Sequence, residues 1–177
     1  MAITRTKTRN CDLPVIHRYA EVWLNEAVEM LRPRFKQAGY EIPPVHVSVG
    51  FSTDGYRPGA KKNTIGVCHA RWLTVEGINE IYLTPMRTEP VDVISLLVHE
   101  LIHAVDDCKS GHGPVFQRIS RELRCTDNLR VPLSEFRETI EFYRTMALKL
   151  GRYPRAGVRY SETFDCKEQE QLERMAA

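Results

Sequence analysis

The sequence lacks the hallmarks of membrane-spanning, secreted and disulfide-stabilised proteins. No apolar run approaches the roughly 18 residues of a membrane-spanning helix, and the N-terminal segment MAITRTKTRN lacks the apolar core of a signal peptide. The five cysteines are odd in number and scattered, with no CxxC pair, which argues against a disulfide framework and against a zinc ribbon. We therefore expect a cytoplasmic protein with reduced cysteines and no membrane partner.

The sequence also lacks a strong excess of charge of either sign. The formal net charge is only +2, so any affinity for nucleic acid has to come from local basic patches. No internal repeat or low-complexity tract is visible, and the chain of 177 residues has the length of one domain. These properties favour a single globular domain with a core of its own.

Hydrophobic periodicity predicts an α+β fold. Three runs alternate in the manner of strands, at 45–51, 64–70 and 78–85. Helical spacing predicts helices at 14–39, from Pro90 to a stop at Ser110–Pro114, at 113–125, and from Ser134 to Leu150. In the first of these helices, Ile16 and Tyr19 are expected on the apolar face. We predict a small antiparallel sheet packed on one side by helices.

The two ends of the chain differ in composition from the middle. We predict a flexible basic arm at 1–12, a folded domain at 13–151, and a basic, aromatic segment and tail at 152–177. Basic residues interleaved with tyrosines are typical of single-stranded nucleic-acid binding, which makes Arg152, Arg155 and Arg159 candidate contacts. A solubilising arm and a solvated loop are the competing interpretations.

The most informative stretch runs from residue 92 to 116 and contains an HExxH motif. Residues four apart lie about 40° from each other around a helix axis, so His99 and His103 share one face and can bind one metal ion. Glu100 follows the first histidine, where a zinc-bound water would need a base. Half of the six histidines fall in this stretch, because His112 lies nine residues after His103.

The helix that carries this motif is apolar around most of its circumference, which predicts that it is buried. A narrow polar stripe interrupts it, made of Asp92, Ser95, His99, His103, and Asp106 or Asp107. Buried imidazoles cost free energy unless they are bonded, and a metal ion would satisfy them. Asp106 and Asp107 are candidates to hydrogen-bond the ring nitrogens that do not bind the metal.

The third metal ligand has three candidates. His112 lies in a Gly-rich turn after the helix, although it could instead only pack near Phe116. Glu122 lies at the distance found in metallopeptidases whose third ligand is a later glutamate, and Cys108 is a spare ligand close in sequence. The metzincin pattern is excluded, because positions 106 and 109 carry Asp and Lys where that pattern has Gly and His.

These residues suit peptide hydrolysis with one zinc ion. Catalytic zinc sites keep one coordination position for water, whose pKa the ion lowers to roughly 7. Glu100 would take the proton of that water and later deliver it to the leaving amine. The sequence offers His69, Tyr56 and Tyr143 as candidate stabilisers of the oxyanion.

HELIHAV followed by GHGPVF resembles the SprT-like domain, the zinc metallopeptidase module of bacterial SprT proteins and of Spartan proteases. The strand segments IGVCHA and INEIYLTP resemble the family as well, so the resemblance covers about residues 45–125. It implies zinc ligands at His99, His103 and His112, with Glu100 as catalytic acid and base. It also implies a zincin-like α+β fold in which an extended peptide pairs with the edge of the sheet.

The resemblance has two departures, and it leaves two classes of function open. Many members carry a C-terminal zinc ribbon, which this chain lacks, and the family's cleavage of DNA-attached proteins depends largely on segments outside the metallopeptidase core. We expect a zinc metallopeptidase with protein or peptide substrates, among them DNA-associated proteins. The alternative is a zinc-containing binding module that does not cut, in which a fourth protein ligand such as Cys108 would complete the site.

Overall fold

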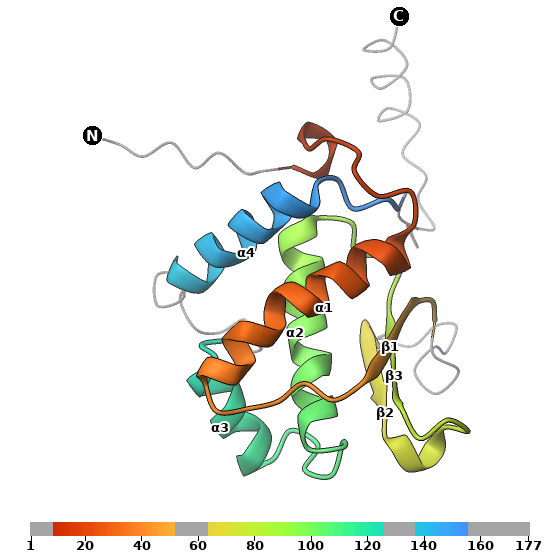
Figure 1. Ribbon diagram of the computed structural model, residues 1–177, viewed down its shortest axis with the longest axis vertical. Coiled ribbons are helices and arrows are strands. Elements are labelled where there is room, and N and C mark those ends of the chain that lie inside the picture. The colour runs from red at the N-terminus through yellow and green to blue at the C-terminus, as the bar shows by residue number, and fades with distance from the viewer. Residues whose placement is uncertain (1–8, 52–63, 126–136, 156–177) are drawn as a thin grey trace, which may run out of the picture.

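The computed structural model describes residues 9–51, 64–125 and 137–155, in which four helices pack on one side of a small sheet (Figure 1). The helices are α1 (Ala20–Gln37), α2 (Pro90–Val105), α3 (Pro114–Glu122) and α4 (Arg137–Leu150). The strands are β1 (Val45–Val49), β2 (Gly66–His69) and β3 (Asn79–Leu83), with short 3-10 helices at Asn10–Asp12 and Arg71–Leu73. The predicted α+β class is confirmed. Within the described ranges, no helix combines the length and apolarity needed to cross a bilayer.

The sheet is mixed, with the strand order β1-β3-β2. β3 pairs antiparallel with β2 and parallel with β1, so the prediction of an antiparallel sheet is wrong for the β1–β3 pair. A short connection joins β2 to β3 and turns the chain back beside its neighbour. β3 is the central strand, with β1 parallel on one side and β2 antiparallel on the other.

The two faces of the sheet differ in polarity, as the alternation in the sequence predicts. Ile81 of β3 lies between Val47 of β1 and Cys68 of β2, and this row packs toward the helices. The neighbouring row on the outer face consists of His46, Glu80 and His69. Because successive strand residues point to opposite faces, the row of histidines and glutamate faces away from the core.

Helix α1 begins later than the sequence predicts. Ile16 and Tyr19, expected on its apolar face, precede the helix and are 54% and 58% exposed, so that expectation is wrong. The chain before α1 is held extended, since the backbone N–H of Arg152 donates to the carbonyl of Pro14 at 2.7 Å. The end was predicted correctly, because Gly39 adopts a φ of 85° and the next N–H bonds back to Phe35.

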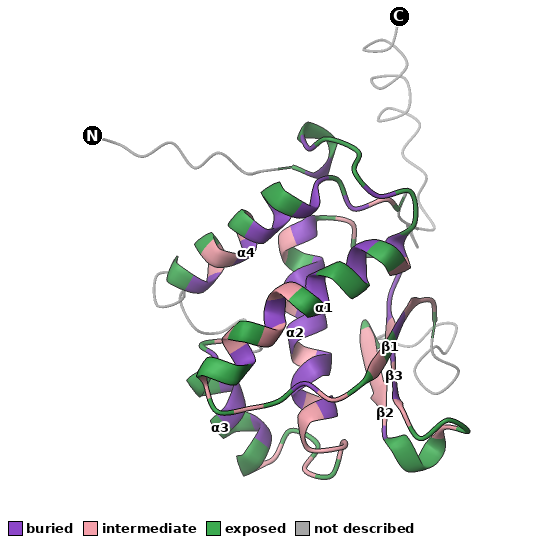
Figure 2. Ribbon diagram, viewed as in Figure 1, coloured by how far each residue is buried: buried purple, intermediate pink, exposed green. Residues whose placement is uncertain are grey.

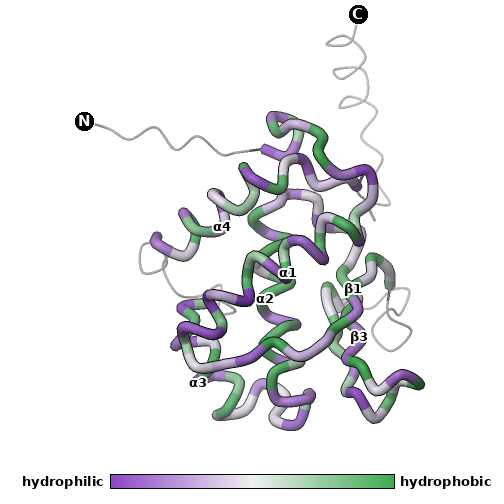
Figure 3. The backbone as a smooth tube through the Cα atoms, in the orientation of Figure 1, coloured by the Kyte–Doolittle hydropathy of each residue, from purple (hydrophilic) through white to green (hydrophobic). Residues whose placement is uncertain are grey.

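Helix α2 lies in the centre of the fold, with the other helices and the sheet around it (Figure 1). Most of its residues are buried (Figure 2), including the side chain of Glu100, of which only 3% is exposed. The other helices each mix hydrophobic and hydrophilic residues, as expected for helices with one face in water (Figure 3). α2 is therefore the element against which the others pack.

Helix α2 ends at Val105, several residues before the predicted stop at Ser110–Pro114. The backbone N–H of Cys108 donates to the carbonyl of His103, and that of Asp107 to Ala104, which together form a Schellman motif. Asp107 and Cys108 both adopt positive φ, at 57° and 59°. This turn was missed because glycine usually occupies the left-handed position of such a motif.

Residues 9–12 and 152–155, predicted to lie outside the folded domain, are bonded to each other, and one residue of each segment, Asn10 and Tyr153, is buried. The side chain of Asn10 accepts from the backbone N–H of Tyr153 at 2.7 Å and donates to its carbonyl at 3.0 Å. Tyr153 is buried and meets Trp23 edge to face, with ring centroids 5.0 Å apart, so it is not available to stack on a base. Arg152 and Arg155 are exposed, whereas Arg159 and the arm at 1–8 lie outside the described residues.

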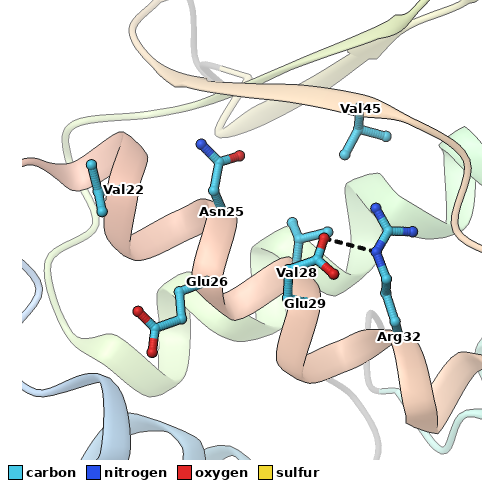
Figure 4. Close-up of a pocket in the computed structure, with 7 residues that line it drawn as sticks. All are labelled: Val22, Asn25, Glu26, Val28, Glu29, Arg32 and Val45. Carbon is cyan, nitrogen blue, oxygen red and sulfur yellow. Dashed lines mark hydrogen bonds and ion pairs between the residues drawn. The ribbon is translucent and has the colours of Figure 1, made fainter.

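We predict that Asn10→Ala lowers the free energy of unfolding by about 2–4 kcal/mol, because it leaves two buried backbone groups of Tyr153 without their partner. Chemical denaturation monitored by circular dichroism measures the loss. Asn25→Ala is the matched control, since Asn25 is exposed on the outer side of α1 near the Glu29–Arg32 ion pair (Figure 4). Equal stability of the two variants would contradict the anchoring role of Asn10.

Candidate metal centre

Three histidine side chains converge on one point beside the C-terminal half of α2. The Nε2 atoms of His99 and His103 are 3.3 Å apart, and the Nε2 of His112 lies 3.1 Å from the first and 3.3 Å from the second. His99 and His103 are half-buried, whereas His112 is exposed. The structure thus brings together the three histidines predicted from the sequence, at a place that solvent can reach.

A triangle of three ring nitrogens cannot be held together by hydrogen bonds alone. Each Nε2 of a neutral imidazole is either one donor or one acceptor, so three of them cannot satisfy all three contacts. A tetrahedral zinc ion with Zn–N bonds of 2.0–2.1 Å holds its ligand nitrogens about 3.3–3.4 Å apart. The observed separations match that geometry, so these residues fit a divalent cation such as zinc.

The helix and the turn after it each supply part of the ligand set. His99 and His103 lie on one face of α2, four residues apart. His112 is placed by a tight turn, in which the backbone N–H of Gly113 donates to the carbonyl of Ser110 at 2.8 Å. A Cβ at Gly113 would lie 2.8 Å from that same carbonyl oxygen, so the turn requires glycine at this position. The side chain of Gln117 adds a 3.2 Å hydrogen bond to the carbonyl of His112.

Phe116 forms an apolar wall for all three imidazoles. Its ring centroid lies 4.9 Å from that of His99, 4.5 Å from His103 and 4.9 Å from His112. The side chain is buried at the start of α3. Rings packed against a fixed aromatic surface lose little freedom on binding a metal, so Phe116 holds the three nitrogens ready. The sequence pointed to Phe116 only as a packing neighbour of His112.

Asp106 and Asp107 accept hydrogen bonds that fix the turn between α2 and His112. Asp107 Oδ1 accepts from the backbone N–H of Arg71 at 2.8 Å and from the side chain of Asn79 at 3.2 Å. The bond from the Arg71 N–H is the main reason that the pKa of Asp107 is lowered. Asp106 Oδ2 accepts from the backbone N–H of Ser110 at 3.1 Å. Both carboxylates thus position His112 through the backbone, and their predicted contact with the imidazoles stays a prediction.

The carboxylate of Glu100 packs against the backbone of β2 at Gly66. A Cβ at Gly66 would lie only 2.4 Å from Glu100 Oε1 and 3.0 Å from its Cδ. Gly66 is therefore a position at which strand and helix approach closely beside the motif, and a larger residue there would displace the carboxylate. Sequence reasoning missed this residue, although a glycine within a strand pattern indicates such a close approach.

The other candidates for the site lie elsewhere. Glu122 accepts a hydrogen bond from the hydroxyl of Tyr40, and Cys108 Sγ lies 3.2 Å from the carbonyl of Cys68. His69 lines a groove on the outer face of the sheet, and the Tyr143 hydroxyl lies 3.5 Å from Cys125 Sγ in the core. Tyr56 lies outside the described residues.

Within the described part of the chain, no fourth histidine, cysteine or carboxylate completes the cluster of His99, His103 and His112. A tetrahedral ion held there would keep one position for a molecule from solvent. No family model, curated protein or solved structure matches this chain. The interpretation of the site therefore depends on its own geometry.

We predict that the full chain binds one zinc ion and that His112→Ala weakens binding by more than about 100-fold. Even partners outside the ligand set are typically worth 10- to 100-fold in metal affinity, and a ligand is worth more. Competition with a chromophoric chelator measures the affinity. His46→Ala is the control, because His46 lies on the outer face of the sheet, paired with Glu80. Equal zinc affinity of the two variants would exclude His112 as a ligand.

Proposed function

We propose that this protein is a zinc-dependent metallopeptidase of the SprT-like type, with a zincin-like fold built around a buried HExxH helix. The observation that carries the proposal is the triangle of three histidine nitrogens, beside Glu100, with no fourth protein ligand among the described residues. A purely structural zinc site is usually closed by four protein ligands. The geometry therefore favours a catalytic site over a structural one.

A zinc ion held by the three histidines would act as a Lewis acid and lower the pKa of a water molecule in its remaining position to roughly 7. Glu100 is the chain's own proton carrier in this proposal. Its carboxylate accepts a proton as the water attacks the peptide carbonyl and then delivers that proton to the leaving amine nitrogen. The close packing at Gly66 fixes the side chain of Glu100 for both transfers.

The position of β2 suggests how a substrate would be held. Among the residues that the structure describes, β2 pairs only with β3 and leaves its second edge unused, and its first residue packs against Glu100. An extended peptide could add to that edge through backbone hydrogen bonds, which would favour unfolded or flexible protein segments as substrates. We include DNA-associated proteins among the candidates, with the exposed Arg152 and Arg155 as possible contacts to DNA.

A zinc-containing binding module remains the competing function. It would need a closed site, and Cys108 was the sequence's candidate to close it. The thiol of Cys108 instead contacts the carbonyl of Cys68, and it does not join the histidine cluster. A buried carboxylate beside the ligands also has no purpose in a module that only binds. Both observations support the peptidase.

We predict that Glu100→Gln retains zinc and loses peptide cleavage by at least about 100-fold, the lower range of general acid–base contributions. Glutamine keeps the shape of the side chain but cannot carry the proton. Cleavage of unfolded casein or a quenched fluorescent peptide library measures activity, and metal analysis measures zinc. Full activity in this variant would overturn the mechanism, whereas loss of zinc would show that Glu100 supports the fold of the site.

We predict that Gly66→Ala lowers kcat by about 10- to 100-fold, because the added methyl displaces the carboxylate of Glu100 and small misplacements of catalytic groups are costly. Gly50→Ala is the matched control, since its Cβ would meet nothing closer than a ring carbon of Tyr82 at 3.9 Å. Circular dichroism and zinc content establish that both variants fold. If both retain full kcat, the carboxylate does not depend on this contact.

A further inference from the structure

Two cysteines far apart in the sequence meet next to the metal centre. Cys68 lies in β2 and faces the helices, whereas Cys108 lies in the turn between α2 and His112. The Sγ of Cys108 donates to the carbonyl oxygen of Cys68 at 3.2 Å, and the Sγ of Cys68 lies 3.9 Å from the carbonyl oxygen of His69. The two thiols are close enough to act on each other, since the neighbouring Cys108 thiol raises the pKa of Cys68 and the Cys68 thiol lowers that of Cys108. Both are free and half-buried. Neither is needed as a metal ligand or as a proton carrier.

The backbones that carry these thiols are held together by bonds that do not involve sulfur. Just after β2, the backbone N–H of Arg71 donates to Asp107, the residue before Cys108. Asn79 of β3 donates to the same oxygen atom. On the turn side, the backbone N–H of Cys108 is fixed to the carbonyl of His103 at 2.8 Å. These bonds therefore keep Cys68 and Cys108 as neighbours.

We propose that Cys68 and Cys108 form a reversible disulfide that ties the metal-binding turn to the edge strand of the sheet. The proposal rests on the zinc site and on its histidine ligands, and it does not depend on peptide hydrolysis. Disulfides in reducing compartments are usually transient and regulatory, and a half-buried pair next to a functional turn has the position expected of such a switch.

The oxidant in this proposal is a peroxide. One thiolate attacks a peroxide oxygen, the O–O bond breaks, and the attacking sulfur becomes a sulfenic acid while the departing hydroxide takes up a proton to form water. The thiol of the other cysteine attacks that sulfur, the S–O bond breaks, and the thiol proton joins the departing hydroxide to form a second water. The two sulfur atoms together lose two electrons, which reduce hydrogen peroxide to two molecules of water. A dithiol reductant reverses the change.

The consequence follows from where the new bond lies. His112 is the ligand that does not belong to α2, so release of the metal requires the turn to move away from the helix. A covalent bond at Cys108 fastens that turn to β2 and removes its open conformations. Oxidation therefore holds the metal in place, and reduction lets the turn move.

The test uses the full chain loaded with zinc and treated with stoichiometric hydrogen peroxide. Intact mass should fall by two hydrogen atoms, and non-reducing peptide mapping should show Cys68 linked to Cys108. Transfer of zinc to an excess of chelator should slow by about tenfold or more, because a cross-link removes conformations from the open state. Dithiothreitol should restore the original mass and the original rate.

The variants separate this proposal from the proposed catalysis. Cys108→Ser and Cys68→Ser should each abolish the link and the effect of peroxide on zinc transfer, whereas Cys11→Ser, which changes an exposed thiol, should retain both. Glu100→Gln should still form the link, because the link does not use the proton carrier. Peptide mapping that finds both thiols unlinked after oxidation, or an unchanged rate of zinc transfer in the linked protein, would overturn the inference.

Discussion

Three imidazole nitrogens held 3.1–3.3 Å apart are the constraint on which the rest of this structure depends. Such an arrangement is unfavourable without a shared cation, so the surrounding chain has to keep it assembled. α2 supplies two of the nitrogens from one face of the helix. The Schellman turn and the bonds to Asp107 return the chain so that His112 faces them, and Phe116 packs against all three rings. These contacts together restrict the movement of the three histidine side chains.

The central helix carries polar groups into the interior at a cost that its apolar residues offset. Glu100 is buried, yet it sits on a helix whose other residues form the main packing surface of the protein. Burial of a carboxylate costs free energy unless the group is paired or hydrogen-bonded. The glycine at position 66 gives that carboxylate its space, so the strand is adapted to the helix at this point. This one contact between β2 and α2 therefore fixes the position of the Glu100 carboxylate.

Much of this could be predicted from the sequence, because local spacing encodes it. The i, i+4 histidines, the helix start at Pro90, the stop at Gly151 and the positions of the three strands all follow from periodicity and from cap residues. Other features depend on contacts between distant segments. Alternation shows which residues share a face, but it does not give strand direction, so the parallel β1–β3 pair was missed. Gly66 meets Glu100, and Asn10 is buried against Tyr153, which are both contacts between segments far apart in the sequence. The exposure of Ile16 likewise depends on how its segment packs and not on local spacing.

The strand order has a kinetic meaning as well. β2 and β3 are near neighbours in the sequence and can pair early, whereas Val45 of β1 must find Asn79, across a separation of 34 residues (79 minus 45). Closing long loops is slow relative to forming local contacts. The hairpin of β2 and β3 is therefore expected to pair before β1 joins the sheet. In a chain that refolds from the unfolded state, β1 is thus expected to complete the sheet after β2 and β3 have paired.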